Sequence, residues 1–235
     1  MSLCQGRISG YGRLQARPLR MTITPTTRCN YSCRMCNQNH TQDSCLLTNF
    51  FNELENYPPF LEGLHHLGGE IFLSPIGRAL LYRMNNIDYP YLRVGLITNG
   101  SFLSDRVLTR LENHSFIYII VSIHAVTPAT YQKITGQDLL EKVVANVERV
   151  LQFRGRSLSP FHIVISFTVM MSNYHELRQH LAFWRDKPVE CLIIPIEVDR
   201  LGESIFETQQ RVQAVLDISE PLLTSEEKDP PHVHG

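Results

Sequence analysis

The feature that most constrains this chain is a run of three closely spaced cysteines, Cys29, Cys33 and Cys36, in the pattern Cys-x3-Cys-x2-Cys. The preceding stretch Met21–Thr24 is short, β-prone and followed by Pro25, so the cysteines are expected on a loop that leaves the end of a strand. Four thiolates would close an iron–sulfur cube, whereas three leave one iron without a protein ligand. An open coordination position of this kind is typical of catalytic metal sites.

The other cysteines leave two alternatives to consider. A disulfide framework is typical of small secreted chains, but this chain has 235 residues and its first residues, Met1–Arg20, contain no apolar signal segment. Structural zinc usually takes a second pair of ligands, for which His40 and Cys45 lie nearby. Cys45 could also close the cube as a fourth ligand, but we expect it to pack as a small hydrophobic residue beside Leu46.

Charge and hydropathy exclude some classes of function. The formal net charge is −1, so the overall charge does not attract the protein to nucleic acid or to an anionic membrane. No apolar run reaches the ~20 residues that a membrane-spanning helix needs. Apolar residues make up 43% of the chain, which is ample for a buried core. We therefore expect a soluble, cytoplasmic protein.

The cysteine loop after a first strand resembles that of the radical S-adenosylmethionine (radical SAM) enzymes. The resemblance implies a [4Fe-4S] cluster bound by Cys29, Cys33 and Cys36, whose free iron is chelated by the amino and carboxylate groups of SAM. The residue before the third cysteine, often aromatic in the family, is here Met35. That residue is similar to the subgroup related to peptide- and protein-modifying members with a C-terminal SPASM extension, and its thioether can pack against the adenine.

Strand and helix patterns alternate along the chain and indicate an α/β fold with a parallel sheet. The expected strands are Met21–Thr24, Leu61–Leu67, Tyr91–Ile97, Phe116–Ile123, Phe161–Met170 and Cys191–Ile196. Helices are expected between them, and a last one over Ile205–Leu216. Six units are too few for an eight-unit barrel, and the pattern alone does not separate a partial barrel from a flat sheet. The resemblance implies a (β/α)6 partial TIM barrel of the radical SAM type.

Polar residues follow the carboxyl end of each expected strand, where parallel α/β sheets bind their ligands. After the cysteine loop they are Gly68, Gly69 and Glu70, then Thr98 and Asn99, then Ser122 and His124, then Asn173, and last Pro195 and Glu197. A single polar loop is weak evidence, because loops are polar in general. Their joint placement predicts one site along one rim of the sheet.

The resemblance assigns roles in SAM binding to these residues. Gly68-Gly69-Glu70 looks like the family's Gly-Gly-Glu-Pro element, in which small residues allow backbone carbonyls to approach the ligand and Glu70 accepts from the SAM ammonium. Thr98 and Asn99 are similar to a Thr-Asn-Gly element of the family. Ser122 is similar to the serine that contacts the ribose or the carboxylate.

Three departures from the family pattern bear on SAM affinity. Ile71 replaces the proline of the Gly-Gly-Glu-Pro element, and His124 stands where many relatives have Asp. Relatives often have Arg at the position of Thr135, and Lys133 would replace it only as a point charge. The charge of His124 is expected to depend on pH.

The resemblance implies reductive cleavage of SAM to a 5′-deoxyadenosyl radical, which abstracts hydrogen from a substrate. It also implies an external electron donor, flavodoxin- or ferredoxin-like. The substrate is not identified by the sequence, and a peptide or protein is one candidate class. No cysteine follows Cys191, so auxiliary clusters are expected to be absent, and a partner protein is one candidate for closing the open side of the barrel.

Two other functions stay open: a catalytically degenerate iron–sulfur or zinc protein of the same fold, and an interaction module whose N-terminal arm recruits a partner enzyme. In the expected organisation, residues 1–20 form an irregular lead-in, residues 21–223 the radical SAM core and residues 224–235 a disordered tail.

Overall fold

In the computed structural model of the protein, residues 18–38, 61–196, 202–207, 210 and 213 are described. Their centre is one six-stranded sheet in which every neighbouring pair is parallel and the strand order follows the sequence, β1-β2-β3-β4-β5-β6. The strands are β1 (Arg20–Ile23), β2 (Gly63–His66), β3 (Arg93–Thr98), β4 (Ser115–Ser122), β5 (His162–Val169) and β6 (Glu190–Pro195). The predicted order of six parallel strands is therefore confirmed.

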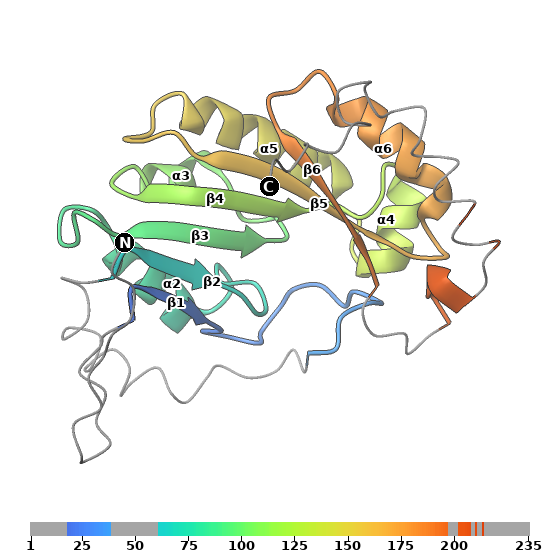
Figure 1. The fold of residues 1–235 in the computed structure, drawn as a ribbon, viewed down its shortest axis with the longest axis horizontal. Coiled ribbons are helices and arrows are strands. Elements are labelled where there is room, and N and C mark those ends of the chain that lie inside the picture. The colour runs from blue at the N-terminus through green and yellow to red at the C-terminus, as the bar shows by residue number, and fades with distance from the viewer. Residues whose placement is uncertain (1–17, 39–60, 197–201, 208–209, 211–212, 214–235) are drawn as a thin grey trace, which may run out of the picture.

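The helices connect successive strands (Figure 1). They are α2 (Pro75–Arg83), α3 (Asp105–Thr109), α4 (Pro128–Thr135), α5 (Leu140–Arg154) and α6 (Leu177–Trp184), with 3-10 turns η2 (Tyr174–Glu176) and η3 (Ile205–Glu207). The helix expected between the first two strands, which begins at Cys45 and ends at Tyr57-Pro58-Pro59, lies outside the described residues, as do most of the helix expected at Ile205–Leu216 and the tail. The first turn of that last segment is a 3-10 turn. No helix within the described residues is long and apolar enough to cross a membrane.

Helix starts follow the local sequence. Ser74 precedes Pro75, and its hydroxyl accepts a hydrogen bond from the N–H of Gly77 at 3.1 Å. Thr127 caps α4 in the same way, and the helix ends at Gly136 with a φ of +72°. Ser104 occupies the cap position of α3, but its side chain makes no capping hydrogen bond.

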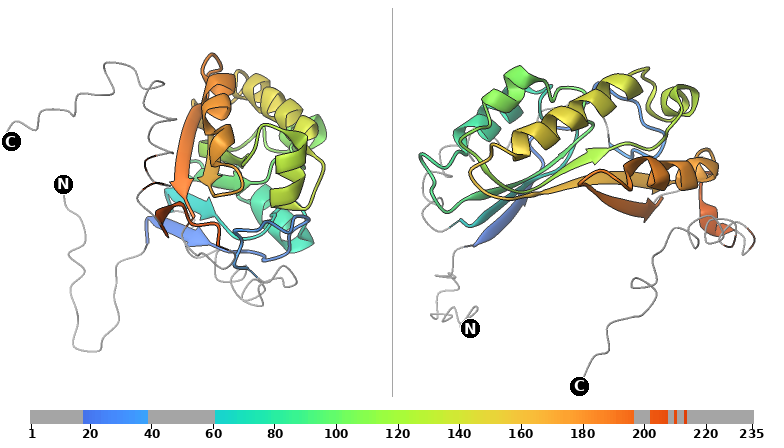
Figure 2. Two further views of the ribbon diagram at one scale, coloured as in Figure 1. Left: turned by 90° about the vertical axis from the view of Figure 1, so that its right-hand side faces the viewer. Right: turned by 90° about the horizontal axis from the view of Figure 1, so that it is seen from above.

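Helices α2, α3 and α5 cover one face of the curved sheet (Figure 2). Alternate residues of β4, including Ile119 and Val121, are buried in the core under that face, where Val143 and Val147 of α5 pack. Each such side chain contributes about 1.5–3 kcal/mol on burial. The other alternate residues of β4 point to the opposite face, where Tyr118 hydrogen bonds to Nδ1 of His65 at 2.7 Å. The sheet stays open, with β1 and β6 as its edges.

Candidate functional site

The cysteine loop crosses the carboxyl end of the sheet and is held by backbone hydrogen bonds on both sides. At its start, the N–H groups of Gly69 and Glu70 donate to the carbonyls of Thr26 and Arg28 at 2.8 and 2.7 Å. Farther along, the N–H groups of Ser32 and Arg34 donate to the carbonyls of Thr135 and Ile134 at the end of α4, both at 2.9 Å. A loop that leaves the edge strand β1 is thus joined both to the turn after β2 and to the end of α4.

Gly68 and Gly69 permit this close approach of two backbone segments. A Cβ atom on Gly69 would lie 2.2 Å from the carbonyl oxygen of Arg28, and one on Gly68 would lie 2.5 Å from that of Thr26. Gly68 also has a φ of +110°, which side-chain-bearing residues rarely adopt. The sequence predicted small residues here for contact with a ligand. In the structure, the segment that lies against them is the start of the cysteine loop itself.

The three thiols are half-buried at Cys29 and Cys33 and exposed at Cys36. Sγ of Cys29 accepts from the backbone N–H of Tyr31 at 3.4 Å and from Nδ2 of Asn99 at 3.8 Å. Burial, together with the charges of the neighbouring Cys29 and Cys36, raises the pKa of Cys33 to about 12. Three thiolates at this place therefore need a cationic centre to compensate their charge.

The three thiols do not already form the ligand group of a single ion. Among the described residues, no three His, Cys, Asp or Glu side chains gather as the ligands of one metal ion would. A cube makes a different demand, because each thiolate binds a different iron and a [4Fe-4S] cluster takes its protein ligands from cysteine. Cys29, Cys33 and Cys36 are the residues that would hold such a cluster. The other ligand candidates, His40 and Cys45, lie outside the described residues.

Glu70 lies at the corner between β2 and β3 and is buried, with 1% of its surface exposed. Its carboxylate accepts from the hydroxyl of Thr98 at 2.8 Å, from the N–H of Asn99 at 2.9 Å and from the N–H of Phe72 at 3.3 Å. Burial raises the pKa of Glu70 to about 7 even though these three hydrogen bonds lower it. The predicted neighbours Glu70, Thr98 and Asn99 are therefore brought into one contact network.

Asn99 connects this network to the cysteine loop. Its Nδ2 donates to Oδ1 of Asn30 at 2.9 Å as well as to Sγ of Cys29, and its Oδ1 accepts from the backbone N–H of Ser101 at 3.0 Å. Asn30 in turn donates to the hydroxyl of Ser101 at 3.2 Å. Asn30 and Ser101 were missed by the sequence reasoning. Their only sequence signal is proximity, because Asn30 directly follows Cys29 and Ser101 lies two residues after Asn99.

Ser122 and His124 lie at the carboxyl end of β4 and bond to β5. The hydroxyl of Ser166 donates to that of Ser122 at 3.2 Å. Nδ1 of His124 accepts from the backbone N–H of Thr168 at 3.0 Å, and burial lowers the pKa of His124 to about 4. The expectation that the charge of His124 varies with pH is therefore wrong for the physiological range, because the burial keeps the imidazole neutral there.

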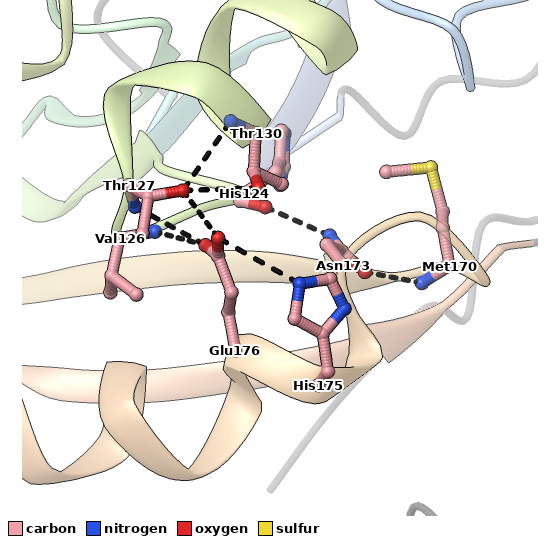
Figure 3. A network of polar contacts seen from close by, with 8 residues as sticks. All are labelled: His124, Val126, Thr127, Thr130, Met170, Asn173, His175 and Glu176. Carbon is pink, nitrogen blue, oxygen red and sulfur yellow. Dashed lines mark hydrogen bonds and ion pairs between the residues drawn. The ribbon is translucent and has the colours of Figure 1, made fainter.

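A second polar network fixes the loops after β4 and β5 to each other (Figure 3). Asn173 donates to the carbonyls of His124 and Thr168 at 2.8 and 2.9 Å and accepts from the N–H of Met170 at 2.7 Å. Asn173 is fully buried, so this rim candidate is a structural residue of the scaffold. Glu176 accepts from the N–H groups of Val126 and Thr127 at the start of α4.

Thr135 and Met35, at which the sequence departs from the family pattern, both contact neighbouring segments of the protein. Thr135 is buried, its hydroxyl donates to the carbonyl of Tyr131 at 2.8 Å, and its own carbonyl holds Ser32. Met35 is partly buried and packs against a cluster of Ile134, Met170 and Ile196.

Lys133 is exposed in the last turn of α4. Pro195 is exposed at the end of β6, and Glu197 lies outside the described residues.

Two further residues of the loop were not found from the sequence. The hydroxyl groups of Tyr31 and Tyr131 lie 2.9 Å apart and both side chains are buried. Arg34 forms an ion pair with Glu203, whose distance along the chain hid the contact from pattern analysis.

Comparisons with known proteins agree with this geometry. Residues 23–183 match the sequence model of the Radical SAM superfamily. A probable GTP 3′,8-cyclase of Sulfurisphaera tokodaii is 26% identical over 214 residues, covering 88% of this chain and 64% of that protein. The GTP 3′,8-cyclase of Synechococcus elongatus is 29% identical over 194 residues, covering 77% and 55%. The chain thus spans less than two thirds of the length of these relatives.

Two solved structures share the fold. The chain anSMEcpe with bound AdoMet has a TM-score of 0.64 at 16% identity, covering 87% of this chain and 60% of that chain. SuiB of Streptococcus suis bound to S-adenosylmethionine has a TM-score of 0.61 at 12% identity, covering 87% and 45%. These likenesses confirm the open (β/α)6 partial barrel.

Proposed function

Because the chain belongs to the radical SAM superfamily, a family of enzymes that use a [4Fe-4S] cluster and SAM, we propose that it binds such a cluster through Cys29, Cys33 and Cys36. When bound, the cluster and SAM supply reductive cleavage to a 5′-deoxyadenosyl radical, which abstracts hydrogen from a substrate. The observation that carries the proposal is the cysteine loop, held from both sides above the carboxyl end of a parallel sheet.

The described residues suggest how this chain would hold SAM. Glu70 has three donors, and a carboxylate offers about four acceptor positions, so it retains capacity for one N–H of the SAM ammonium. Thr98 and Asn99 are oriented by Glu70. Met35 supplies a thioether for the adenine from a partly buried position, and Ser122 a hydroxyl on the uncovered face of the sheet.

His124 has a narrower role than the sequence suggested. Its Nδ1 is occupied by the N–H of Thr168, so the neutral ring carries its proton on Nε2. In this proposal His124 offers SAM one neutral donor. The backbone of Gly68 and Gly69 contributes mainly by fixing the start of the cysteine loop.

The subgroup and the substrate remain proposals with two candidates. Met35 supports the SPASM-related subgroup and with it a peptide or protein substrate; one solved relative of the same fold is SuiB bound to the precursor peptide SuiA. The named sequence relatives are GTP 3′,8-cyclases, which makes GTP the second candidate. Formation of 5′-deoxyadenosine that is stimulated by GTP but by no peptide would decide for the second candidate.

Radical SAM enzymes need an electron donor, and we propose a flavodoxin- or ferredoxin-like protein for this chain. The exposed position of Cys36 supports approach of such a donor to the cluster from outside. The face of the sheet that no described helix covers, with edges at β1 and β6, supports a partner protein as the wall that closes the barrel.

Anaerobic reconstitution followed by iron and sulfide analysis tests the cluster. Wild type should bind about four irons, and alanine at any one of Cys29, Cys33 and Cys36 should abolish binding. Cys191→Ala is the matched control, because Cys191 is an exposed free cysteine on β6. Dithionite with SAM should then release methionine and 5′-deoxyadenosine. One zinc with no sulfide in the wild type would refute the enzymatic function.

A second candidate function is a degenerate protein of the same fold that binds partners without cleaving SAM. It is favoured by three residues whose polar groups already bond within the protein: Glu70, His124 and Thr135. Titration calorimetry on the reconstituted protein separates the two. Absence of SAM binding to a protein with a full cluster would support the degenerate reading.

A further inference from the structure

The cysteine loop is also joined to the segment that follows the last strand. Arg34, which directly follows Cys33, places both Nε and Nη2 on Oε1 of Glu203 at 2.8 and 2.7 Å. The other oxygen, Oε2, accepts from the backbone N–H of Ser172 at 2.9 Å, and the carbonyl of Glu203 accepts from the N–H of Met171 at 3.0 Å. One carboxylate therefore ties the loop after β1 to the connections after β5 and β6.

The contact between Arg34 and Glu203 is supported by the surroundings of the carboxylate. The side chain of Glu203 is 6% exposed, so the carboxylate has little water, and the hydrogen bonds from Arg34 and Ser172 help to satisfy it. Two residues along, Ile205 is buried with Phe167, Val169 and Leu177, which anchors the Glu203 segment on β5 and α6. The arginine that this segment holds belongs to the ligand loop.

The pair also sets the charge beside the proposed cluster. Net charge and hydrogen bonding around a cluster tune its reduction potential. An uncompensated guanidinium on the ligand loop would stabilise the reduced, more negative cluster and raise its potential. A carboxylate on that guanidinium cancels this effect while it fixes the loop between Cys33 and Cys36.

We propose that Glu203 is a positioning residue for the cysteine loop, which acts through Arg34 and keeps the reduction potential of the cluster low. The inference rests on the proposed cluster and adds a residue outside the motif, from the opposite edge of the sheet.

The experiment measures the midpoint potential of the cluster by an EPR-monitored titration with dithionite in the absence of SAM. Glu203→Gln should shift the potential upward, because it leaves Arg34 uncompensated. Arg34→Gln should shift it downward, because it removes the positive charge from the ligand loop while the carboxylate of Glu203 remains. The double variant should return toward wild type. Glu148→Gln is the control. Glu148 lies on the outer helix α5 and forms an ion pair with Lys187, so its replacement should leave the potential unchanged.

The signs separate this role from a purely structural one. If Glu203 only braced the loop, both single variants would break the same contact and shift the potential in the same direction. That result, or equal potentials in all variants, would overturn the inference. If Glu203→Gln alone fails to retain iron, Arg34→Gln and the double variant still give the two opposing signs. Iron and sulfide analysis of the wild type tests the cluster separately, so a failure of the proposed function is recognised before any variant is compared.

Discussion

Two buried carboxylates at different corners of the rim are stabilised in opposite ways. Glu70, between β2 and β3, has a pKa that burial raises to about 7. Glu176 lies in the 3-10 turn after β5, and its burial by itself would raise its pKa. Hydrogen bonds from Thr127, Thr130 and the N–H of Val126 outweigh this effect and hold the pKa below its usual range. Glu176 faces the start of α4, where the helix dipole favours an anion.

The difference indicates which corner is complete without a ligand. The charge of Glu176 is compensated by the scaffold, so this corner fixes loops. The charge of Glu70 is compensated only in part, and a cation placed beside it would lower its pKa again. Strongly shifted groups of this kind concentrate at functional sites. The β2–β3 corner is therefore the one where we expect SAM to bind.

The largest effect is expected where the β2–β3 corner meets the cysteine loop. Gly69→Ala places a Cβ atom against the backbone of Arg28, which no side-chain rotation relieves. We expect loss of the cluster and destabilisation of about 3 kcal/mol. Gly155→Ala is the control, because Gly155 has an ordinary helical φ of −63° and its added Cβ would meet nothing closer than 3.4 Å. Retention of iron by the Gly69 variant would show that the contact is dispensable.

The pH dependence of stability should differ between the two carboxylates. Because the pKa of Glu70 is higher in the folded state, the native protein binds the proton more tightly. Its contribution to stability is full below pH 4.5 and is lost as the pH rises through about 7, by roughly 2–3 kcal/mol. Glu70→Gln should remove this loss. The measurement is urea unfolding of the apoprotein from pH 4 to pH 8.

The same variant tests the ligand role, because Glu70→Gln should leave the absorbance of the cluster intact and weaken SAM binding in calorimetry. If the free energies of unfolding of wild type and Glu70→Gln changed with pH in the same way, the raised pKa of Glu70 would be refuted, and with it the difference between the two corners.

Glu176→Gln should behave in the opposite sense. The lowered pKa of Glu176 means that its contribution is present above the usual pKa and is lost as the pH falls through the lowered one. At neutral pH we expect destabilisation of about 2 kcal/mol from weakened bonds to the start of α4, with iron content and SAM affinity unchanged. Reduced SAM affinity at full iron content would extend the functional site to the β4–β5 corner.

The smallest expected effect is that of Ser122→Ala. Its hydroxyl accepts one 3.2 Å hydrogen bond from Ser166, so the free energy of unfolding should fall by about 1 kcal/mol or less. A larger loss in SAM affinity than in stability would identify Ser122 as a ligand contact. Ser166→Ala, which removes the other partner of the same bond, separates the two contributions.

Much of the site could be anticipated because motif residues lie close in sequence and at strand ends. The cysteine loop, Gly68-Gly69-Glu70 and Thr98-Asn99 meet at one corner as predicted, since parallel strands bring their carboxyl ends to one edge. The roles of His124 and Asn173 could not be predicted, because the sequence pattern of a polar residue at a strand end is the same whether its side chain faces a ligand or the next strand.

The sequence by itself determined the six parallel units and the cysteines that follow the first of them. The periodicity of apolar residues and the spacing of ligand residues depend only on neighbouring positions, so both can be recognised in the amino-acid sequence. Tertiary structure alone decided which polar groups are already satisfied, that Gly69 packs on Arg28, and that Arg34 meets Glu203. Burial and long-range contacts fix these outcomes, and both depend on where segments far apart in sequence come to lie.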